Sequence, residues 1–416
     1  MAEWIAPLRR RGLIQDTTPL PEHPHLVGAA YVGIDPTANS LHIGHLVPLQ
    51  ILYHLRQVGI QPIIVVGGAT ARIGDPSGKK SERPLLPPEQ VAENARQLAL
   101  QLQKLLPFPF TLVDNFSWLG SFSLLDFLRE VGKYITVSYL LAKETVSSRL
   151  ESGISFTEFS YPLLQAYDFY YLYQHYGCKL QIGGADQWGN ITTGIELIRK
   201  LTGAETYGIT APLLTKADGT KFGKTEGGEN IWLDAQRTSP YRFYQFWIQQ
   251  TDADIERLLP IFSWKAEEEI AGLLERHRAA PDKRIAQRAL AWEMTERIHG
   301  EETAQAVEQI SAVIFGEGSL ELLEKVAESF FRQIVEEMPH FITPTAEVSV
   351  TEVLAQSGFV SSKSEVRRLI QQGGIAINRQ RIQEGELLLK TIAPLRERYW
   401  LLQRGKKHYA WLVLRD

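Results

Sequence analysis

Two histidines, His42 and His45, stand three residues apart around Gly44, where an apolar run gives way to a helical pattern. The run from 27 to 34 is typical of a short buried strand, and the Asp-Pro-Thr sequence at 35–37 interrupts it. Both imidazoles are therefore expected near the positive N-terminal end of the following helix, and Gly44 leaves the backbone there open to an anionic chain. The arrangement favours phosphate binding. At this point it is equally compatible with histidines that only cap or face a helix.

A glycine-rich segment, residues 67–79, follows a second apolar run at 61–67. Loops of this kind bring main-chain amides and a few side chains against a ligand at the carboxyl ends of parallel strands. An ordinary turn-rich connection would have the same composition. The segment is therefore a candidate binding loop rather than a motif that stands alone.

Three polar residues, Tyr161, Gln165 and Asp168, recur at helical spacing and so share one face of a helix. Such a face packs poorly against an apolar sheet unless a polar ligand lies against it. Apolar neighbours such as Phe159 and Phe169 argue against a fully solvated stripe. This face is expected to line a site for a small polar molecule.

Two lysines, Lys221 and Lys224, flank a glycine in a stretch rich in Gly, Asp and Glu. The composition indicates a loop, and cations on a loop can close on phosphates when these are present. A lysine-rich loop that is merely solvated is the alternative.

The elements that must position these residues follow an alternating pattern. Strand-like runs at 61–67 and 110–113 enclose a helical stretch at 88–106, and helical patterns continue to residue 150. A helical stretch at 161–176, a strand-like run at 179–182 and a helix at 187–201 follow. Alternation of this kind predicts a parallel sheet wrapped by helices.

Beyond Pro240 the pattern becomes helical alone, with expected helices starting at 240 and covering 264–278, 282–299 and 301–314. Ser263 is expected to cap the second of them. Prolines then punctuate residues 339–345, which predicts a linker. Past it, 351–354 and 364–372 read as short helices and 375–378 as a short strand.

Composition bounds the class of protein. The chain has 416 residues, 44% of them hydrophobic and 22% charged, as in soluble globular proteins of about three domains. No apolar run approaches the roughly 20 residues of a membrane helix, and the N-terminus lacks the apolar centre of a signal peptide. A cytoplasmic protein without membrane association is expected. The single cysteine, Cys178, excludes an internal disulfide and a multi-thiolate zinc site.

Charge is distributed unevenly along the chain. The net charge is −4, but residues 349–416 carry +6 and the rest carries −10. A basic region of this size can be an ordinary solvated surface. It is also what binding to phosphodiesters requires.

Together these motifs resemble a known family. Residues 42–45 match the His-Ile-Gly-His motif of class I aminoacyl-tRNA synthetases, and 221–225 resemble their Lys-Met-Ser-Lys-Ser loop in the Lys-Phe-Gly-Lys-Thr form of bacterial tyrosyl-tRNA synthetases. Residues 183–190 are similar to a segment that lies between these motifs in the same family. The likeness runs from about Tyr31 to the carboxyl end. Phe222, Gly223 and Thr225 depart from the commoner loop sequence, but both lysines are retained.

The resemblance implies an ATP-dependent ligase that forms tyrosyl-adenylate and pyrophosphate and then transfers the tyrosyl group to the terminal ribose of tRNA(Tyr). No covalent enzyme intermediate is needed, so catalysis would consist of positioning and of stabilising charge on the phosphates. By similarity, the catalytic residues are His42, His45, Lys221, Lys224 and Thr37. The implied ATP-binding residues are Gly33, Asp35, Gly44, Gly183, Gly184, Asp186, Lys224 and Thr225.

For the amino acid, the family pattern assigns Tyr31 and Asp168 to the substrate phenol. Asp75, Tyr161 and Gln165 would surround the α-amino group, and Gln187 would lie near the carboxylate. A site whose buried polar groups need the substrate hydroxyl rejects phenylalanine by roughly 10⁴ to 10⁵, a magnitude taken from a tyrosyl enzyme that is itself the reference example of this effect.

The basic tail has its own resemblance. Residues 361–370 and 373–378 look like the small RNA-binding domain shared by a small-subunit ribosomal protein and the bacterial tyrosyl enzymes. Lys363, Arg367 and Arg368 lie at helical spacing and are the candidate RNA-binding residues.

The expected fold is therefore α/β, with a Rossmann-like parallel-sheet catalytic domain, an α-helical domain and a small α+β RNA-binding domain. The expected boundaries are 1–225, 226–338, a linker at 339–348, and 349–416. The family implies a homodimer. No metal site is written into the chain, so Mg²⁺ is expected to arrive with ATP.

Two other readings stay open. A tryptophanyl-type synthetase shares the fold, although the Tyr31 and Asp168 pair and the basic tail disfavour it. A non-catalytic RNA-binding relative would have kept the fold without the chemistry, and the intact histidines and lysines count against this.

Overall fold

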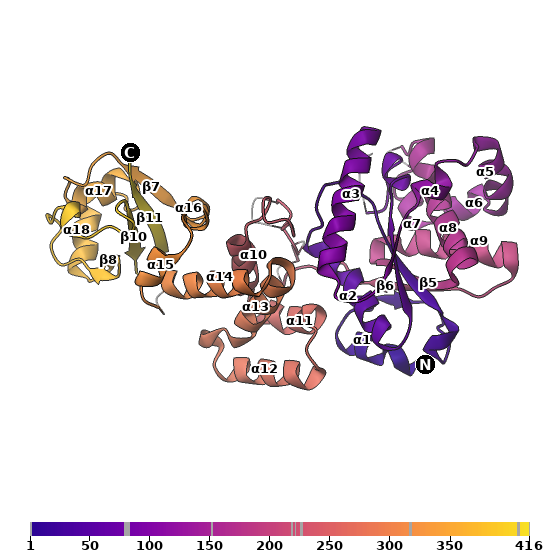
Figure 1. Cartoon of the computed structure of the whole chain (residues 1–416), viewed down its shortest axis with the longest axis horizontal. Helices are drawn as coiled ribbons and strands as arrows, with labels where there is room; N and C mark the ends of the chain where they lie inside the picture. The colour runs from indigo at the N-terminus through magenta and orange to yellow at the C-terminus, as the bar shows by residue number, and fades with distance from the viewer. Residues whose placement is uncertain are drawn as a thin grey trace. The chain divides into compact units, whose positions relative to one another are not determined.

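The computed structural model describes residues 2–78, 84–150, 153–217, 219–220, 222–224, 228–315, 318–405 and 408–415. They form two compact units (Figure 1). The first contains residues 1–238 and 248–290, and the second contains residues 239–247 and 291–416. Each unit is built around its own sheet.

The sheet of the first unit has six strands in the order β1-β6-β5-β2-β3-β4. All neighbours pair in parallel except β1, which runs antiparallel to β6 at the edge. The strands are β1 (Asp16–Thr17), β2 (Ala29–Ile34), β3 (Gln61–Val66), β4 (Thr111–Asp114), β5 (Cys178–Gly184) and β6 (Tyr207–Ala211). The predicted α/β fold with a parallel sheet is confirmed.

Both faces of this sheet are buried, as expected for parallel strands covered by helices. On one face Tyr31 and Ile63 pack with Phe169 of α8 (Phe156–Tyr176) and Ile198 of α9 (Trp188–Thr202). On the other face, α2 (Ile43–Gln57) contacts β2 and β3, and α3 (Pro88–Leu105) contacts β3. Figure 1 shows α2 and α3 on one side of the strands and α8 and α9 on the other. The central strands are therefore fixed from both sides.

Shorter helices complete the first unit: α1 (Ala6–Arg10), α4 (Phe116–Leu119), α5 (Leu124–Glu130), α6 (Val137–Leu141), α7 (Glu144–Ser147), α11 (Asp252–Phe262) and α12 (Glu267–Ala279). The expectation that Ser263 caps a helix starting at 264 is wrong. Ser263 ends α11, donating its N–H to Leu259, and α12 begins after Ala266. The cause is the carboxylate of Glu269, which accepts the N–H of Ala266 and sets the helix start three residues later.

The second unit combines helices with a small sheet. Its helices are α10 (Pro240–Ile248), the later part of α13 (Ile285–His299), α14 (Glu301–Ile314), α15 (Glu321–Lys325), α16 (Glu328–Glu337), α17 (Val350–Gln356) and α18 (Lys363–Gln371). The sheet has the order β7-β11-β10-β8-β9, formed by β7 (His340–Thr343), β8 (Ile375–Ile377), β9 (Gln380–Arg381), β10 (Tyr399–Arg404) and β11 (His408–Leu414). Its core joins Val353 and Val366 of the helices to Trp400 and Leu412 of the strands.

The segment expected to be a linker is structured in part. Residues His340–Thr343 form strand β7, which pairs in parallel with β11 and places Thr343 in the interior. The reason is that β11 pairs with β10 along one edge only, so its other edge is free to accept a further strand. Prolines at 339 and 344 bound this strand rather than marking an irregular connection.

None of the helices within the described ranges is both long enough and apolar enough to span a membrane.

Candidate active site

The two histidines form the first turn of α2. His42 is the N-cap, and its Nδ1 accepts the N–H of Gly44 at 3.1 Å, while Nδ1 of His45 accepts the N–H of His42 at 3.0 Å. The rings stack with their centroids 3.9 Å apart. A Cβ at Gly44 would lie 2.9 Å from Cε1 of His42, so glycine is required by the folded-back ring. The capping alternative and the phosphate interpretation are therefore compatible, because each capping bond uses Nδ1.

This capping fixes the proton of each neutral ring on Nε2, which makes that nitrogen a hydrogen-bond donor. Burial lowers the pKa of His45 well below its ordinary value, and the adjacent His42 lowers it further. His45 is therefore a neutral donor at physiological pH. A neutral donor can bind a phosphate oxygen without exchanging its proton.

The described part of the lysine loop lies beside these histidines. The carbonyl of Gly223 accepts the N–H of Ile231, and the carbonyl of Ile231 accepts the N–H of Ile43, at 3.0 and 3.1 Å. The main chain of Lys224 forms an isolated antiparallel β-bridge with Asn230. The rings of Trp232 and His42 make an edge-to-face contact with their centroids 5.8 Å apart. Residues 230–232 thus connect the described part of the lysine loop to the start of the histidine helix. Lys221 and Thr225 lie outside the described residues.

Asp168 of α8 is a buried carboxylate held by side chains that follow β4. Asp168 is 4% exposed, and its two oxygens accept hydrogen bonds from Nδ2 of Asn115 at 2.9 Å and Nε1 of Trp118 at 2.8 Å. Tyr31 lies close by in β2, and its hydroxyl is buried without a hydrogen-bond partner among the described residues. An orphaned phenol hydroxyl beside a carboxylate is the arrangement expected of a site whose partner is a ligand hydroxyl.

The pKa values of Asp168 and Tyr31 are both shifted by their buried position. Burial raises the pKa of Asp168 from 3.8 to about 7, against the opposing effect of the hydrogen bonds from Asn115 and Trp118. Burial also raises the pKa of the Tyr31 phenol well above its ordinary value, and the charge of Asp168 adds to this. Both effects follow mainly from burial, which disfavours the charged form of each group.

A second polar cluster surrounds Asp75. Its Oδ2 accepts Nε2 of Gln187 at 2.6 Å, and its Oδ1 accepts the N–H of Ser77 at 2.9 Å. Gln165 donates to Gln187 at 3.3 Å, and the fully buried Asn190 donates to Gln165 at 3.0 Å. The structure therefore brings together Asp75, Gln165 and Gln187, which lie more than 20 positions apart in the sequence.

Tyr161 belongs to the same side of the site. Its hydroxyl donates to Oδ2 of Asp35 at 2.8 Å, and Oδ1 of Asp35 accepts the hydroxyl of Thr70 at 2.7 Å. Asp35, predicted for ATP, thus contacts a residue predicted for the amino acid. Burial raises the pKa of Tyr161 well above its ordinary value, with a further contribution from Asp35.

The remaining predicted residues lie around these clusters. Gly33 and Thr37 are exposed at and just after the end of β2. Gly183 and Gly184 end β5, and Asp186 follows on the next turn, where a Cβ at Gly184 would lie 2.6 Å from its Oδ1. All of these belong to the carboxyl-end side of the parallel strands, where α/β proteins bind ligands.

Sequence reasoning missed Asn115, Trp118, Asn190 and Thr70. Asn115 and Trp118 directly follow β4, and that position at a carboxyl strand end was the available signal. Asn190 stands in the family-like segment at 183–190, but nothing in its spacing indicates that it contacts Gln165.

The three candidate RNA-binding residues lie on α18 with exposed side chains. Each is paired with a carboxylate: Lys363 with Glu352 at 3.0 Å, Arg367 with Glu386 at 3.1 Å, and Arg368 with Glu365 at 3.9 Å. Surface pairs of this kind are weak and can exchange for phosphate. Their contact with RNA stays a prediction.

Among the described residues, no group of three or more His, Cys, Asp or Glu side chains is arranged to hold a metal ion.

Comparison with known proteins defines the class. The family model for class I tRNA synthetases (W and Y) matches residues 27–316, and a second model, the tyrosine–tRNA ligase C-terminal domain, matches 331–412. The tyrosine–tRNA ligases of Amoebophilus asiaticus and Geobacillus stearothermophilus are 47% and 46% identical to the chain, over 98% of it and 99% and 98% of their own lengths. A C-terminally truncated mitochondrial tyrosyl-tRNA synthetase of Aspergillus nidulans has a similar structure, with a TM-score of 0.68 and 32% identity over 75% of this chain and 94% of that one.

The chain therefore belongs to the class I tRNA synthetases of the tryptophan and tyrosine group. Within that family the near full-length identity places it with the tyrosine–tRNA ligases, which makes it an ATP-dependent aminoacyl-tRNA synthetase. The resemblance seen in its motifs is confirmed, and the tyrosyl reading holds over the tryptophanyl and non-catalytic alternatives.

Proposed function

We propose that the chain activates L-tyrosine with ATP in the pocket between Tyr31 and Asp168 and transfers the tyrosyl group to tRNA(Tyr). The observation that carries this proposal is the hydroxyl of Tyr31, which is buried without a hydrogen-bond partner among the described residues and lies near the buried carboxylate of Asp168. A substrate phenol that donates to Asp168 and accepts from Tyr31 satisfies both groups. Tryptophan and phenylalanine offer no such oxygen.

The amino and carboxylate groups of tyrosine are assigned to the second cluster. Asp75 and the Tyr161 hydroxyl supply the acceptors for an ammonium group, and Gln165 lies on the same network. Gln187, at the start of α9, faces the carboxylate that attacks the α-phosphate. Attack expels pyrophosphate, and the attacking carboxylate oxygen forms the new bond to phosphorus.

The phosphates of ATP are assigned to the two motifs joined by residues 230–232. His42 and His45 donate from Nε2, Lys221 and Lys224 supply positive charge from the loop, and Thr37 adds a hydroxyl. Gly33, Asp35, Gly44, Gly183, Gly184, Asp186 and Thr225 complete the proposed ATP site. Mg²⁺ enters as a complex with ATP, held largely by phosphate oxygens.

The basic C-terminal region, residues 349–416, supplies the proposed contact with tRNA through Lys363, Arg367 and Arg368.

Transfer to tRNA takes place where translation consumes the product, so we assign the protein to the cytoplasm. The four-part domain division predicted from the sequence is kept as part of this proposal, with residues 340–343 assigned to the sheet of the tail.

A homodimer is also proposed. Four strongly exposed apolar side chains fall within one stretch of the first unit: Leu124 at 69%, Leu125 at 77%, Val137 at 62% and Phe156 at 74% exposure. Apolar side chains concentrated in this way favour burial against a partner. A second copy of the chain is the occupant that the family resemblance implies.

The test is single-turnover formation of tyrosyl-adenylate by the intact protein and by Lys224→Ala, with the exposed Lys104→Ala as a matched control. Loss of one phosphate contact should slow the step by about 10² or more, and the control should react at the rate of the unaltered protein. An unchanged rate in Lys224→Ala would contradict the assignment of the loop to ATP.

A further inference from the structure

Helix α11 contacts the lysine loop at both of its ends. The loop is preceded by a turn in which the N–H of Gly219 donates to the carbonyl of Lys216. Within this turn, the N–H of Ala217 donates to Oδ1 of Asp254 at 2.7 Å. At the other end of the helix, the ring of Phe262 packs on Phe222 of the loop with centroids 5.8 Å apart. One helix therefore holds the chain on either side of Lys221.

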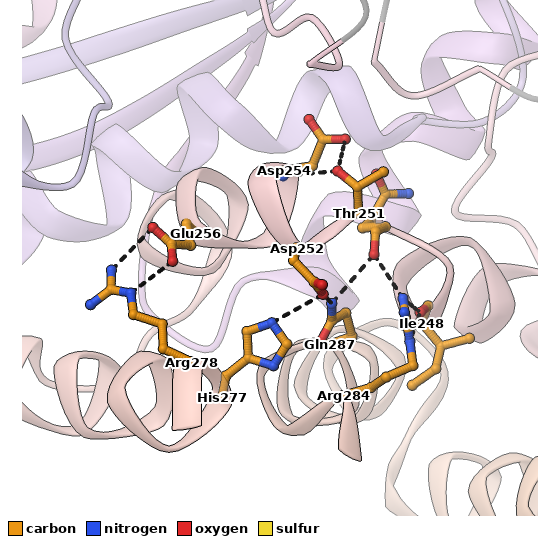
Figure 2. A network of polar contacts seen from close by, with 10 residues as sticks. Ile248, Thr251, Asp252, Asp254, Glu256, His277, Arg278, Arg284 and Gln287 are labelled. Atoms are coloured by element: carbon orange, nitrogen blue, oxygen red, sulfur yellow. Dashed lines mark hydrogen bonds and ion pairs between the residues drawn. The ribbon is translucent and has the colours of Figure 1, made fainter. Parts of the chain in front are cut away.

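Asp254 is unusual for a residue in the first turn of a helix. It is 4% exposed, and its main-chain N–H donates to the Thr251 hydroxyl, which in turn donates to Oδ2 of Asp254 at 2.8 Å. Figure 2 shows the Asp254 carboxylate meeting Thr251 in this way. Its second oxygen points out of the helix to the loop. A buried carboxylate that accepts a main-chain N–H in a dry environment forms a strong, directional bond.

The helix that carries Asp254 is itself tied to the histidine helix. The amide of Gln50, on α2, donates to the carbonyl of Phe262, and its oxygen accepts Nε1 of Trp264. Gln50 is 1% exposed, so this link is shielded from water. The path from His45 to the loop therefore runs through α2, Gln50, α11 and Asp254.

The first turn of α11 is braced from the opposite side. Oδ1 of Asp252 accepts Nε2 of Gln287 at 2.8 Å and lies 3.2 Å from Nε2 of the buried His277. Arg284 donates to the carbonyls of Ile248 and Gln250 just before the helix. Figure 2 shows these contacts gathered around the start of α11. Asp254 is thus presented to the loop by a helix whose start is held in place.

We propose that Asp254 is a positioning residue for tyrosine activation, because it fixes the turn before the loop lysines relative to His42 and His45. The inference rests on the proposed function, in which those lysines hold the phosphates of ATP. The carboxylate does not touch the reacting atoms. Its role is to restrict the main chain at Ala217 before ATP binds, so that less conformational entropy is lost when ATP is bound.

The experiment compares Asp254→Ala, Asp254→Asn and the exposed Glu256→Ala of the same helix in the full-length protein. Glu256 pairs with Arg278 and forms no hydrogen bond or ion pair with the described residues of the loop, which makes it the matched control. Single-turnover rates of adenylate formation are normalised to active sites by burst titration, and the dissociation constants of ATP and tyrosine are measured separately. Normalisation removes any loss caused by unfolded protein.

Asp254→Ala is expected to slow activation per active site, or to weaken ATP binding, by about 10-fold, with tyrosine binding unchanged. Asp254→Asn keeps an acceptor for the Ala217 N–H and should stay within about 3-fold of the unaltered protein, as should Glu256→Ala. An Asp254→Ala protein with unaltered rate and ATP affinity, an equal loss of tyrosine affinity, or an Asn variant as impaired as Ala would overturn the proposal.

Two further variants keep the outcomes separable. Lys224→Ala is measured in parallel: if it reacts normally, the assignment of the loop to ATP fails, whereas an impaired Lys224→Ala with a normal Asp254→Ala overturns only the role of Asp254. If Asp254→Ala does not fold, Phe222→Leu tests the second anchor and is expected to reduce activation while leaving tyrosine binding intact. Normal activation by Phe222→Leu would then count against the proposal.

Discussion

The indole N–H of Trp118 donates to Oδ1 of Asp168 at 2.8 Å, although 50 positions separate the two residues. Trp118 follows the carboxyl end of β4, and Asp168 lies in the middle of α8. The bond orients the carboxylate that is proposed to read the substrate phenol. It also supports the charged form of a group that burial pushes toward neutrality.

Replacing Trp118 by Phe should lower kcat/KM for tyrosine by about 10- to 150-fold, because a hydrogen bond to a charged group is worth roughly 1.5–3 kcal/mol. The activity with phenylalanine should change little, since that substrate does not use Asp168. Steady-state pyrophosphate exchange with both amino acids measures the ratio. An equal loss with both substrates would indicate general damage to the pocket instead.

The raised pKa of Asp168 predicts a pH dependence of stability. With a pKa of about 7 in the fold, against an ordinary value of 3.8, the folded protein holds a proton that the unfolded chain has already lost. Stability contributed by this group is therefore present at acid pH and falls as the pH rises through 4 to about 7.

Asp168→Asn removes this dependence. The ligand-free variant is expected to melt several degrees above the unaltered protein at pH 8, and the difference should shrink toward pH 5. Thermal unfolding of both proteins across that range makes the comparison. A difference in melting temperature that is independent of pH would show that Asp168 does not titrate as described.

His45→Ala should slow adenylate formation by about 10² to 10³, the loss associated with one donor to a developing charge. Because His45 also accepts the N–H of His42, the variant should lose about 1 kcal/mol of folding stability. Tyrosine affinity should be unchanged. Rapid-quench kinetics at saturating tyrosine would separate the effects, and a normal rate would refute the role of His45.

Leu125→Asp should convert the proposed dimer into monomers, since a charge would be buried in the pairing surface. Leu100→Asp is the matched control, because Leu100 is also an exposed leucine, at 43%, but lies on α3 outside the segment 124–156. Light scattering gives the mass of each. Retention of the same mass in Leu125→Asp, or a monomeric mass for the unaltered protein, would contradict the proposal.

Much of the catalytic unit could be predicted because its motifs are local. The strand, the break at 35–37 and the helix after His42 are contiguous, so the sequence indicates both the elements and the site that they form. The parallel sheet follows from alternation in the same way. Gly44 is a partial exception, since its requirement comes from the ring of His42 rather than from a ligand alone.

The contacts that complete the site are long-range and leave no local pattern. Asn115 meets Asp168, Asn190 meets Gln165, and Asp254 meets Ala217 only after the sheet and its helices have packed. Likewise β7 looks like a linker because its partner strand, β11, lies about 70 residues further along the chain. Pairing at that separation cannot be deduced from the composition of either segment.

Amino-acid-dependent exchange of labelled pyrophosphate into ATP tests the central claim most directly. Tyrosine, phenylalanine and tryptophan are supplied separately to the purified protein, and Asp168→Asn is measured alongside. Exchange with tyrosine should exceed exchange with phenylalanine or tryptophan by roughly 10⁴ or more, and it should be lost in the variant. Exchange supported equally by phenylalanine or tryptophan, or unaffected by Asp168→Asn, would contradict the assignment of the pocket between Tyr31 and Asp168 to the substrate phenol.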